Sequence, residues 1–267
     1  MRRLAIAAAV LFAMLVPLRA ASSTTWGIDM TDLWWNPGES GWGANISHQQ
    51  DVIFLTLFVY GADGKARWYV APAMVSGLAS QGADHQYTFA GELIEASGPP
   101  LGDAFDAQGV ARRVVGTATL QFSQAEAATL SYSVDGTAVT RAITRQTFRQ
   151  DDLSGAYAGT VMSRPYSSGC ATLAGGGGAT EFSITHSGSS IRIAATIGTR
   201  ACEITGAYTQ AGKMAQVNGL VACENGLRGL FRAWEVEGNY RGFMASYFAD
   251  FGAGCMEAGR MGGMRRY

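Results

Sequence analysis

Apolar and polar residues alternate in short runs along nearly all of the chain after residue 40. The runs are rich in β-branched and aromatic residues and are interrupted by glycine-containing turns, which is typical of half-buried β-strands. No stretch longer than two turns has the 3.6-residue period of an amphipathic helix. The sequence therefore predicts an all-β protein.

The first half contains seven runs of this kind. Asp135-Gly136 and the segment Ala62-Asp63-Gly64-Lys65 are Asp-Gly hairpin turns, because glycine accepts the positive φ that such turns need. Successive strands joined by tight turns form an antiparallel meander. The expected strands are residues 41–48, 51–60, 65–71, 86–94, 113–123, 127–134 and 137–148.

A boundary is expected near Gln150-Asp151-Asp152, after which a second series of strands begins. Eight evenly spaced runs predict an up-and-down barrel, which removes unpaired sheet edges by closing. The fold prediction is thus two antiparallel barrel-like domains, up-and-down and lipocalin-like, over residues 24–150 and 151–267. The expected strands of the second are residues 157–162, 180–185, 190–197, 202–209, 214–223, 227–236, 240–249 and 255–264.

All four cysteines, Cys170, Cys202, Cys223 and Cys255, lie in the second half. An even number without CxxC spacing in an exported protein indicates two disulfides; a zinc site is the alternative. If Gly212-Lys213 forms a two-residue turn, Cys202 and Cys223 lie opposite each other, so we predict this bridge and, by remainder, Cys170 to Cys255. A register shifted by one residue favours Cys170 to Cys202 with Cys223 to Cys255.

The N-terminus predicts export. Residues 1–22 combine Arg2 and Arg3, an apolar run over residues 4–16, and a small-residue end, which is the layout of a cleavable signal peptide. The apolar run is shorter than the roughly 20 residues of a membrane-spanning helix, the alternative interpretation. Cleavage removes three arginines and changes the formal net charge from -1 to -4, which argues against a nucleic-acid partner. We expect a secreted or periplasmic chain with no membrane span.

Tryptophans are concentrated near the start of the mature chain, where five of the six lie between residues 26 and 68. Such rings either fill one end of a barrel or form a platform for a small apolar or carbohydrate ligand. The candidate ligand-binding residues are Trp34, Trp35, Asn36, Glu39, Ser40, Trp42 and Trp68.

The run Trp34-Trp35-Asn36-Pro37-Gly38-Glu39-Ser40-Gly41-Trp42-Gly43, with the later Tyr60–Gly64 turn and Arg67-Trp68-Tyr69, resembles a segment of exported proteobacterial proteins that have no assigned activity. The resemblance implies export and a β fold and transfers no catalytic residue. In strand count alone, the second half resembles lipocalin-type or avidin-type barrels. Those families hold small ligands in the barrel mouth.

No motif for catalysis, a metal or a cofactor is found. Ser40 does not fit the nucleophile-elbow pattern, because Trp42 stands where that pattern needs glycine. His48, His85 and His186 lack the spacing of metal ligands. Arg145, on the last strand of the first half, is expected to stack on an indole near Trp42 and close that end of the barrel.

Three functional hypotheses follow. The leading one is a non-enzymatic exported binding protein that holds an apolar or carbohydrate ligand at the tryptophan-rich site or a barrel mouth. The second is a structural or interaction module of the cell envelope or extracellular matrix that self-associates. The third is a hydrolase whose carboxylates come from scattered loops, with Glu39 acting beside Asp32 or Asp29.

Overall fold

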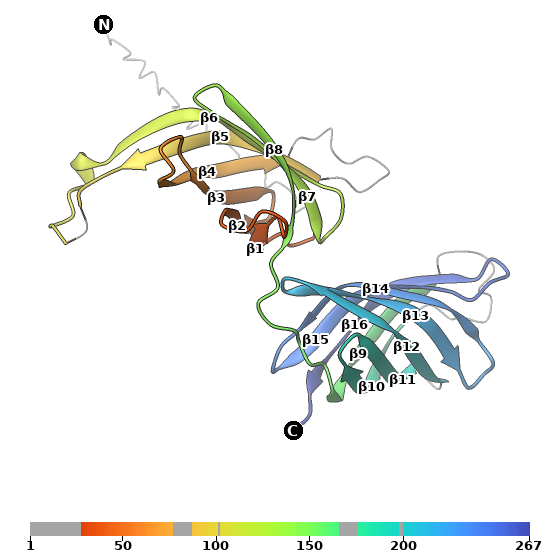
Figure 1. Ribbon diagram of the computed structural model, residues 1–267. Coiled ribbons are helices and arrows are strands. Elements are labelled where there is room, and N and C mark those ends of the chain that lie inside the picture. Colours follow the sequence, from red (N-terminus) through yellow and green to blue (C-terminus); the bar gives the residue numbers. More distant parts are fainter. Residues whose placement is uncertain (1–27, 77–86, 101, 166–175, 198–199) are drawn as a thin grey trace, which may run out of the picture.

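The computed structural model describes residues 28–76, 87–100, 102–165, 176–197 and 200–267. Within these ranges the protein consists of strands, with no α-helix and one short 3-10 helix, η2 (Ala107–Gly109). The strands form two closed antiparallel barrels of eight strands each (Figure 1). The predicted fold class is confirmed. The expected signal peptide, Trp26 and His85 lie outside the described residues.

Each strand of the first barrel pairs with the next, and β8 returns to pair with β1. The strands are β1 (Asp32–Trp35), β2 (Gly43–Gln49), β3 (Val52–Tyr60), β4 (Ala66–Ser76), β5 (Tyr87–Ser97), β6 (Ala111–Phe122), β7 (Ala127–Val134) and β8 (Thr137–Arg145). The sequence-based interpretation missed β1, because four residues are too few for an alternating pattern to be recognised.

The second barrel is also an up-and-down meander, closed by pairing between β9 and β16. Its strands are β9 (Gly155–Pro165), β10 (Gly176–Ser187), β11 (Ser190–Ile197), β12 (Arg200–Ala211), β13 (Met214–Cys223), β14 (Arg228–Gly238), β15 (Gly242–Asp250) and β16 (Met256–Arg265). All eight predicted strands are present, with bounds that differ by a few residues.

Side-chain alternation fills the barrels, as β3 illustrates. Ile53, Leu55 and Leu57 are fully buried and point inward, whereas Phe54 and Phe58 lie on the outside and are about half exposed, at 41% and 48%. Successive residues of a strand face opposite sides of the sheet, so one face of each strand supplies the core and the other faces solvent.

The register between β12 and β13 confirms one predicted disulfide. Ala211 pairs with Met214 around the Gly212-Lys213 turn, and Cys202 pairs directly with Cys223. The two cysteines form a disulfide. Cys170 lies outside the described residues, so its pairing with Cys255 stays a prediction.

An arginine and a tryptophan close one end of the first barrel. Arg145 and Trp34 are direct neighbours across the pairing of β8 with β1, and the guanidinium lies 4.9 Å from the centre of the indole. Trp34 Nε1 donates a hydrogen bond to the Met30 carbonyl at 3.0 Å. The Arg145 guanidinium donates to the carbonyls of Asp29 and Thr31. Stacking on an indole near Trp42 was predicted; the indole is that of Trp34, because the first strand of the barrel is the missed β1.

The second barrel is closed at one end by an equivalent arrangement. The Arg265 guanidinium lies 5.1 Å from the centre of the Tyr157 ring and donates to the carbonyls of Ser154 and Asp152. The Tyr157 hydroxyl donates to the Leu153 carbonyl at 2.7 Å. We refer to these two arrangements as the closed ends of the first and second barrels.

The equivalence extends to the sequence. Residues 29–34 read Asp-Met-Thr-Asp-Leu-Trp and residues 152–157 read Asp-Leu-Ser-Gly-Ala-Tyr, with the acid, the hydroxyl residue and the aromatic at the same spacing. His48 Nδ1 accepts a hydrogen bond from the Met30 amide, and His186 Nδ1 accepts one from the Leu153 amide. The two barrels therefore repeat one closing device, although Arg145 makes additional bonds to Asp32 and Ala125.

The turn between β12 and β13 joins the second barrel to the closed end of the first (Figure 1). The Gly212 amide donates to Thr147 Oγ1 at 2.8 Å, and the Lys213 amide donates to Asp32 Oδ2 at 2.9 Å. Lys213 Nζ also pairs with the Asp29 carboxylate at 2.5 Å. The closed end of the first barrel is thus occupied by its neighbour.

Candidate functional site

The second barrel contains a small internal cavity beside the disulfide. Its volume is about 30 Å³, enough for about one or two water molecules. The lining is largely apolar, with three polar side chains. The lining residues are Val161, Phe182, Ala195, Arg200, Cys202, Ile204, Val221, Cys223, Phe231, Tyr247, Ala249, Phe251, Glu257 and Met261.

The cavity lies away from the closed end of its barrel. Glu257 is near the start of β16 and Arg265 is its last residue, so the two are separated by about 26 Å along the strand. Glu257 thus belongs to the opposite end of the barrel, where Arg200 begins β12. We call this the open end, a name that refers to the described residues alone. The apolar side chains of Leu227 and Phe251 are only partly buried there.

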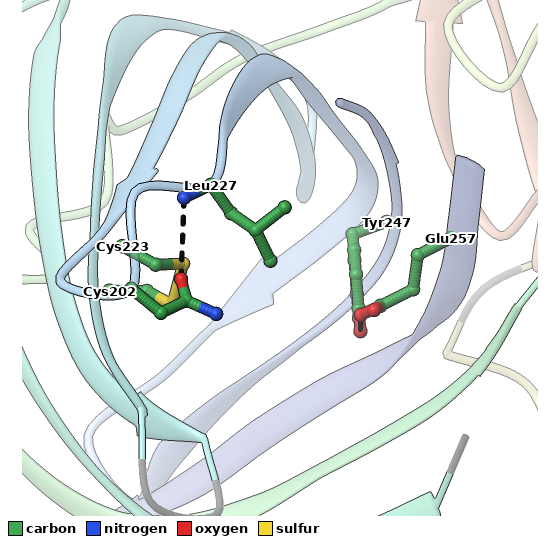
Figure 2. Close-up of a disulfide and its surroundings, with 6 residues drawn as sticks. Cys202, Cys223, Leu227, Tyr247 and Glu257 are labelled. Atoms are coloured by element: carbon green, nitrogen blue, oxygen red, sulfur yellow. Dashed lines mark hydrogen bonds between the residues drawn. A yellow bond between two sulfur atoms is a disulfide. The ribbon is translucent and has the colours of Figure 1, made fainter. Parts of the chain in front are cut away.

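A phenol and a carboxylate meet in the cavity wall. The Tyr247 hydroxyl donates to Glu257 Oε1 at 2.5 Å, and Figure 2 shows the tips of the two side chains in contact. Both residues are buried, at 4% and 6% exposure. They come from neighbouring strands, where Tyr247 pairs with Gly259, two residues from Glu257. A residue without a side chain at position 259 leaves room beside the tyrosine ring.

Burial and the neighbouring carboxylate keep the phenol protonated. Burial raises the pKa of Tyr247, and the hydrogen bond to Glu257 raises it further, since both disfavour a phenolate. Tyr247 therefore acts as a donor at neutral pH. Its one proton is directed to Glu257, so the acceptor capacity of the carboxylate, about four lone-pair sites, is only partly used by this bond.

A larger hollow of about 790 Å³ lies on the outside of the second barrel, between β12 and β15. It is lined by surface residues that include Thr205, Leu220 and Leu230, and Leu220 and Leu230 are more than half exposed. A shallow outer surface does not exclude water from a bound group, whereas the internal cavity does. The candidate site is therefore the open end of the second barrel.

The tryptophan-rich segment divides between the core and the surface. Trp34 is 1% exposed and packs edge-to-face on Phe122, with ring centres 5.3 Å apart. It fills the barrel, as in the first of the two interpretations of these rings. Trp35 is partly buried and pairs with Thr144 across the closing strands.

The remaining residues of this segment form a turn that is bonded to itself and to β8. Asn36 Oδ1 accepts from the Gly38 amide. The Glu39 carboxylate accepts from Trp42 Nε1 and from Arg141 Nε, each at 3.0 Å. Trp42 packs partly buried against the core of the first barrel. Ser40 is exposed.

Trp68 lies on the outside of the first barrel, apart from this turn. It is 52% exposed and pairs across strands with Phe58, which is also exposed. The structure therefore does not gather the seven predicted ligand-binding residues into one site.

The carboxylates considered for a hydrolase have structural partners. Asp32 pairs with Arg145 at 3.2 Å and accepts from the Lys213 amide, while Glu39 pairs with Arg141. Among the described residues, no group of three or more His, Cys, Asp or Glu is arranged to hold a metal ion. In the same part of the chain, no helix is long and apolar enough to cross a membrane.

Sequence reasoning missed Tyr247 and Glu257. One signal was present in the expected strand 255–264: Glu257 lies at an even spacing from Cys255 and Met261 and so shares their face. A single acid on an otherwise apolar strand face is informative only if that face is known to point inward, which requires the barrel to be closed correctly.

Comparison with known proteins finds no match, since neither a family model nor a curated protein nor a solved structure is significantly similar to the chain. The functional conclusion therefore depends on the geometry of the open end alone.

Proposed function

We propose that the protein is an exported, non-enzymatic binding protein that holds a small apolar ligand at the open end of the second barrel. The observation that carries the proposal is the asymmetry of this barrel. One end is filled and bonded shut by Arg265 and Tyr157, while the other has a cavity with mostly apolar walls and a buried polar pair. Pockets with apolar walls and few polar groups are typical of small-ligand sites.

The lining favours an apolar ligand over a carbohydrate. A sugar carries many hydroxyl groups that need partners once buried, and among the described residues of this wall only Arg200, Tyr247 and Glu257 offer side-chain partners. The cavity volume matches one small group of a ligand, and the rest of that ligand would lie against Leu227 and Phe251. The Cys202–Cys223 bridge is compatible with an oxidising compartment such as the periplasm or the medium.

Calorimetric titration with octanol, an uncharged ligand with a narrow alkyl chain, tests this proposal. Ala195→Leu adds volume to the cavity wall, so it should weaken octanol binding by about tenfold or more. Ala158→Leu makes the same change at an exposed position of the same barrel and should leave octanol binding unchanged. Absence of octanol binding to the unaltered protein, or equal binding by both variants, would overturn the proposal.

A second candidate function, self-association as an envelope or matrix module, is supported by Phe58 and Trp68. These large apolar neighbours are exposed on the outside of the first barrel, where they would be covered in an assembly. Light scattering after size-exclusion chromatography tests it: Trp68→Ser should reduce a concentration-dependent increase in mass. A constant monomer mass in the unaltered protein would exclude this function.

A further inference from the structure

The two charged side chains of the open end differ in burial. Glu257 is the only acid and Arg200 the only base among the cavity-lining residues that the structure describes. The carboxylate is in the barrel interior at 6% exposure. Arg200 is only partly buried, at the edge where β12 begins, so water can still solvate part of it.

Among the described side chains, Glu257 has a hydrogen-bond donor but no cation beside it. No lysine or arginine nitrogen lies within 4.0 Å of its carboxylate among the described residues, although ten such ion pairs occur elsewhere in them. The Tyr247 hydroxyl bonds one oxygen. Burial of a carboxylate costs several kcal/mol unless a cation or several donors compensate for the lost water. Binding of a positively charged group beside this carboxylate would therefore be favourable.

We infer that the ligand of the second barrel carries a protonated primary amine, which the Glu257 carboxylate binds. This inference rests on the proposed function, and it adds the chemical class of the ligand. An ammonium group donates three hydrogen bonds and brings the missing charge. Its size suits a cavity of about 30 Å³, and a short alkyl chain attached to it lies against Leu227 and Phe251 at the open end.

The alternatives fit less well. A carboxylate head would be repelled by Glu257 and could pair only with Arg200, which is partly hydrated. An alcohol donates one hydrogen bond and brings no charge. The Tyr247 proton is already directed to Glu257, so the phenol serves as a positioning residue that holds the carboxylate and does not compete for the amine.

Calorimetric titration with three ligands of equal chain length tests the inference on the unaltered protein. Octylamine should bind about tenfold more tightly than octanol, since a charge-assisted hydrogen bond is stronger than a neutral one, and octanoate should bind most weakly. Glu257→Gln should bring octylamine within about twofold of octanol. Glu203→Gln is the matched control, because Glu203 lies on the outer face of the same barrel, paired with Arg192.

The outcomes separate the two proposals. If none of the three compounds binds, the proposed function fails and the inference fails with it. If octanol or octanoate binds as tightly as octylamine, or Glu257→Gln retains the preference for octylamine, the proposed function stands and the amine inference is overturned. Circular dichroism of Glu257→Gln confirms that the variant is folded, and the comparison in the unaltered protein does not depend on it.

Discussion

The Arg145 guanidinium lies 4.9 Å from the centre of the Trp34 indole, and the two residues pair directly across the strands that close the first barrel. Arg145 is 2% exposed. Burial lowers its pKa, an effect that hydrogen bonding to Asp32 opposes. An arginine in this position links the first strand to the last and donates to the carbonyl groups of Asp29, Thr31 and Ala125. One side chain therefore adds to the backbone pairing that closes the barrel.

Arg145→Ala should destabilise the protein by about 3 kcal/mol or more, because it leaves the buried Asp32 carboxylate without its cation and carbonyl groups without donors. It should also shift tryptophan emission to longer wavelength as Trp34 becomes hydrated. Urea denaturation followed by fluorescence measures both effects. Arg141→Ala, four residues earlier on the same strand, removes a partly exposed ion pair with Glu39 and should cost at most about 1 kcal/mol. Unchanged stability and emission in Arg145→Ala would contradict this account of barrel closure.

Gly212→Ala should loosen the contact between the two barrels. Gly212 has φ of +61°, and an added Cβ would collide with the Asp32 carboxylate and lie 2.8 Å from Arg145 Cβ. Gly188→Ala is the matched control, since Gly188 has φ of +59° in another hairpin turn and a Cβ there meets nothing within 4 Å. Both variants carry the same backbone strain, so the difference between them reports the collision. Small-angle X-ray scattering should show a larger maximum dimension for Gly212→Ala only; equal profiles would contradict the prediction.

The ion pair between Lys213 and Asp29 should make the contact between the barrels sensitive to acid. Burial raises the pKa of Asp29, but hydrogen bonds from Lys213 and Thr31 outweigh it, so the net shift is below the ordinary value of 3.8. An acid with a lowered folded-state pKa contributes stability above its unfolded pKa and loses it as the pH falls through the folded value. The contribution is therefore present at neutral pH and is lost below about pH 3.8.

Asp29→Asn should cost up to about 1 kcal/mol at pH 7, because the pair is partly exposed. The difference from the unaltered protein should shrink as the pH is lowered below 3.8. Chemical denaturation across a pH series measures it. Asp63→Asn removes an exposed ion pair with Arg67 within the first barrel, so it controls for general acid effects on stability. Because this pair does not join the two barrels, the small-angle X-ray scattering profile of the variant should stay unchanged at every pH. A difference for Asp29→Asn that stays constant to pH 3 would show that the ionised carboxylate does not support the contact.

Much of the fold was predictable because each strand carries its own alternating pattern and the turns between strands are short. The Cys202–Cys223 bridge followed from one turn and a count of residues. Strand β1 could not be predicted, since its four residues form part of a tryptophan-rich run in which apolar and polar residues do not alternate clearly. This omission also placed Arg145 near Trp42 in the prediction, whereas the indole on which it stacks is that of Trp34.

The candidate site was less predictable, because it depends on contacts between residues that are unremarkable in the sequence. Tyr247 and Glu257 belong to no motif, and their meeting requires the register of β15 on β16 and the inward face of both strands. Tryptophan content, in contrast, suggested either a filled barrel end or a ligand platform, and the structure places Trp34 in a filled core. Large aromatic residues serve both purposes, and only burial distinguishes them.

Loss of the Cys202–Cys223 bridge should affect the open end more than the rest of the second barrel. The bridge spans 21 residues, and restriction of the unfolded chain by a loop of this length corresponds to about 3 kcal/mol. Both cysteines also line the cavity, so Cys202→Ala with Cys223→Ala enlarges it as well as lowering stability. Hydrogen exchange should accelerate first at the amide of Cys223, which donates to the Leu227 carbonyl across the hairpin end, and remain slow at Tyr157 in the closed end. Uniform acceleration through the barrel would contradict a local role, and peptide mapping without reductant identifies the bridge directly.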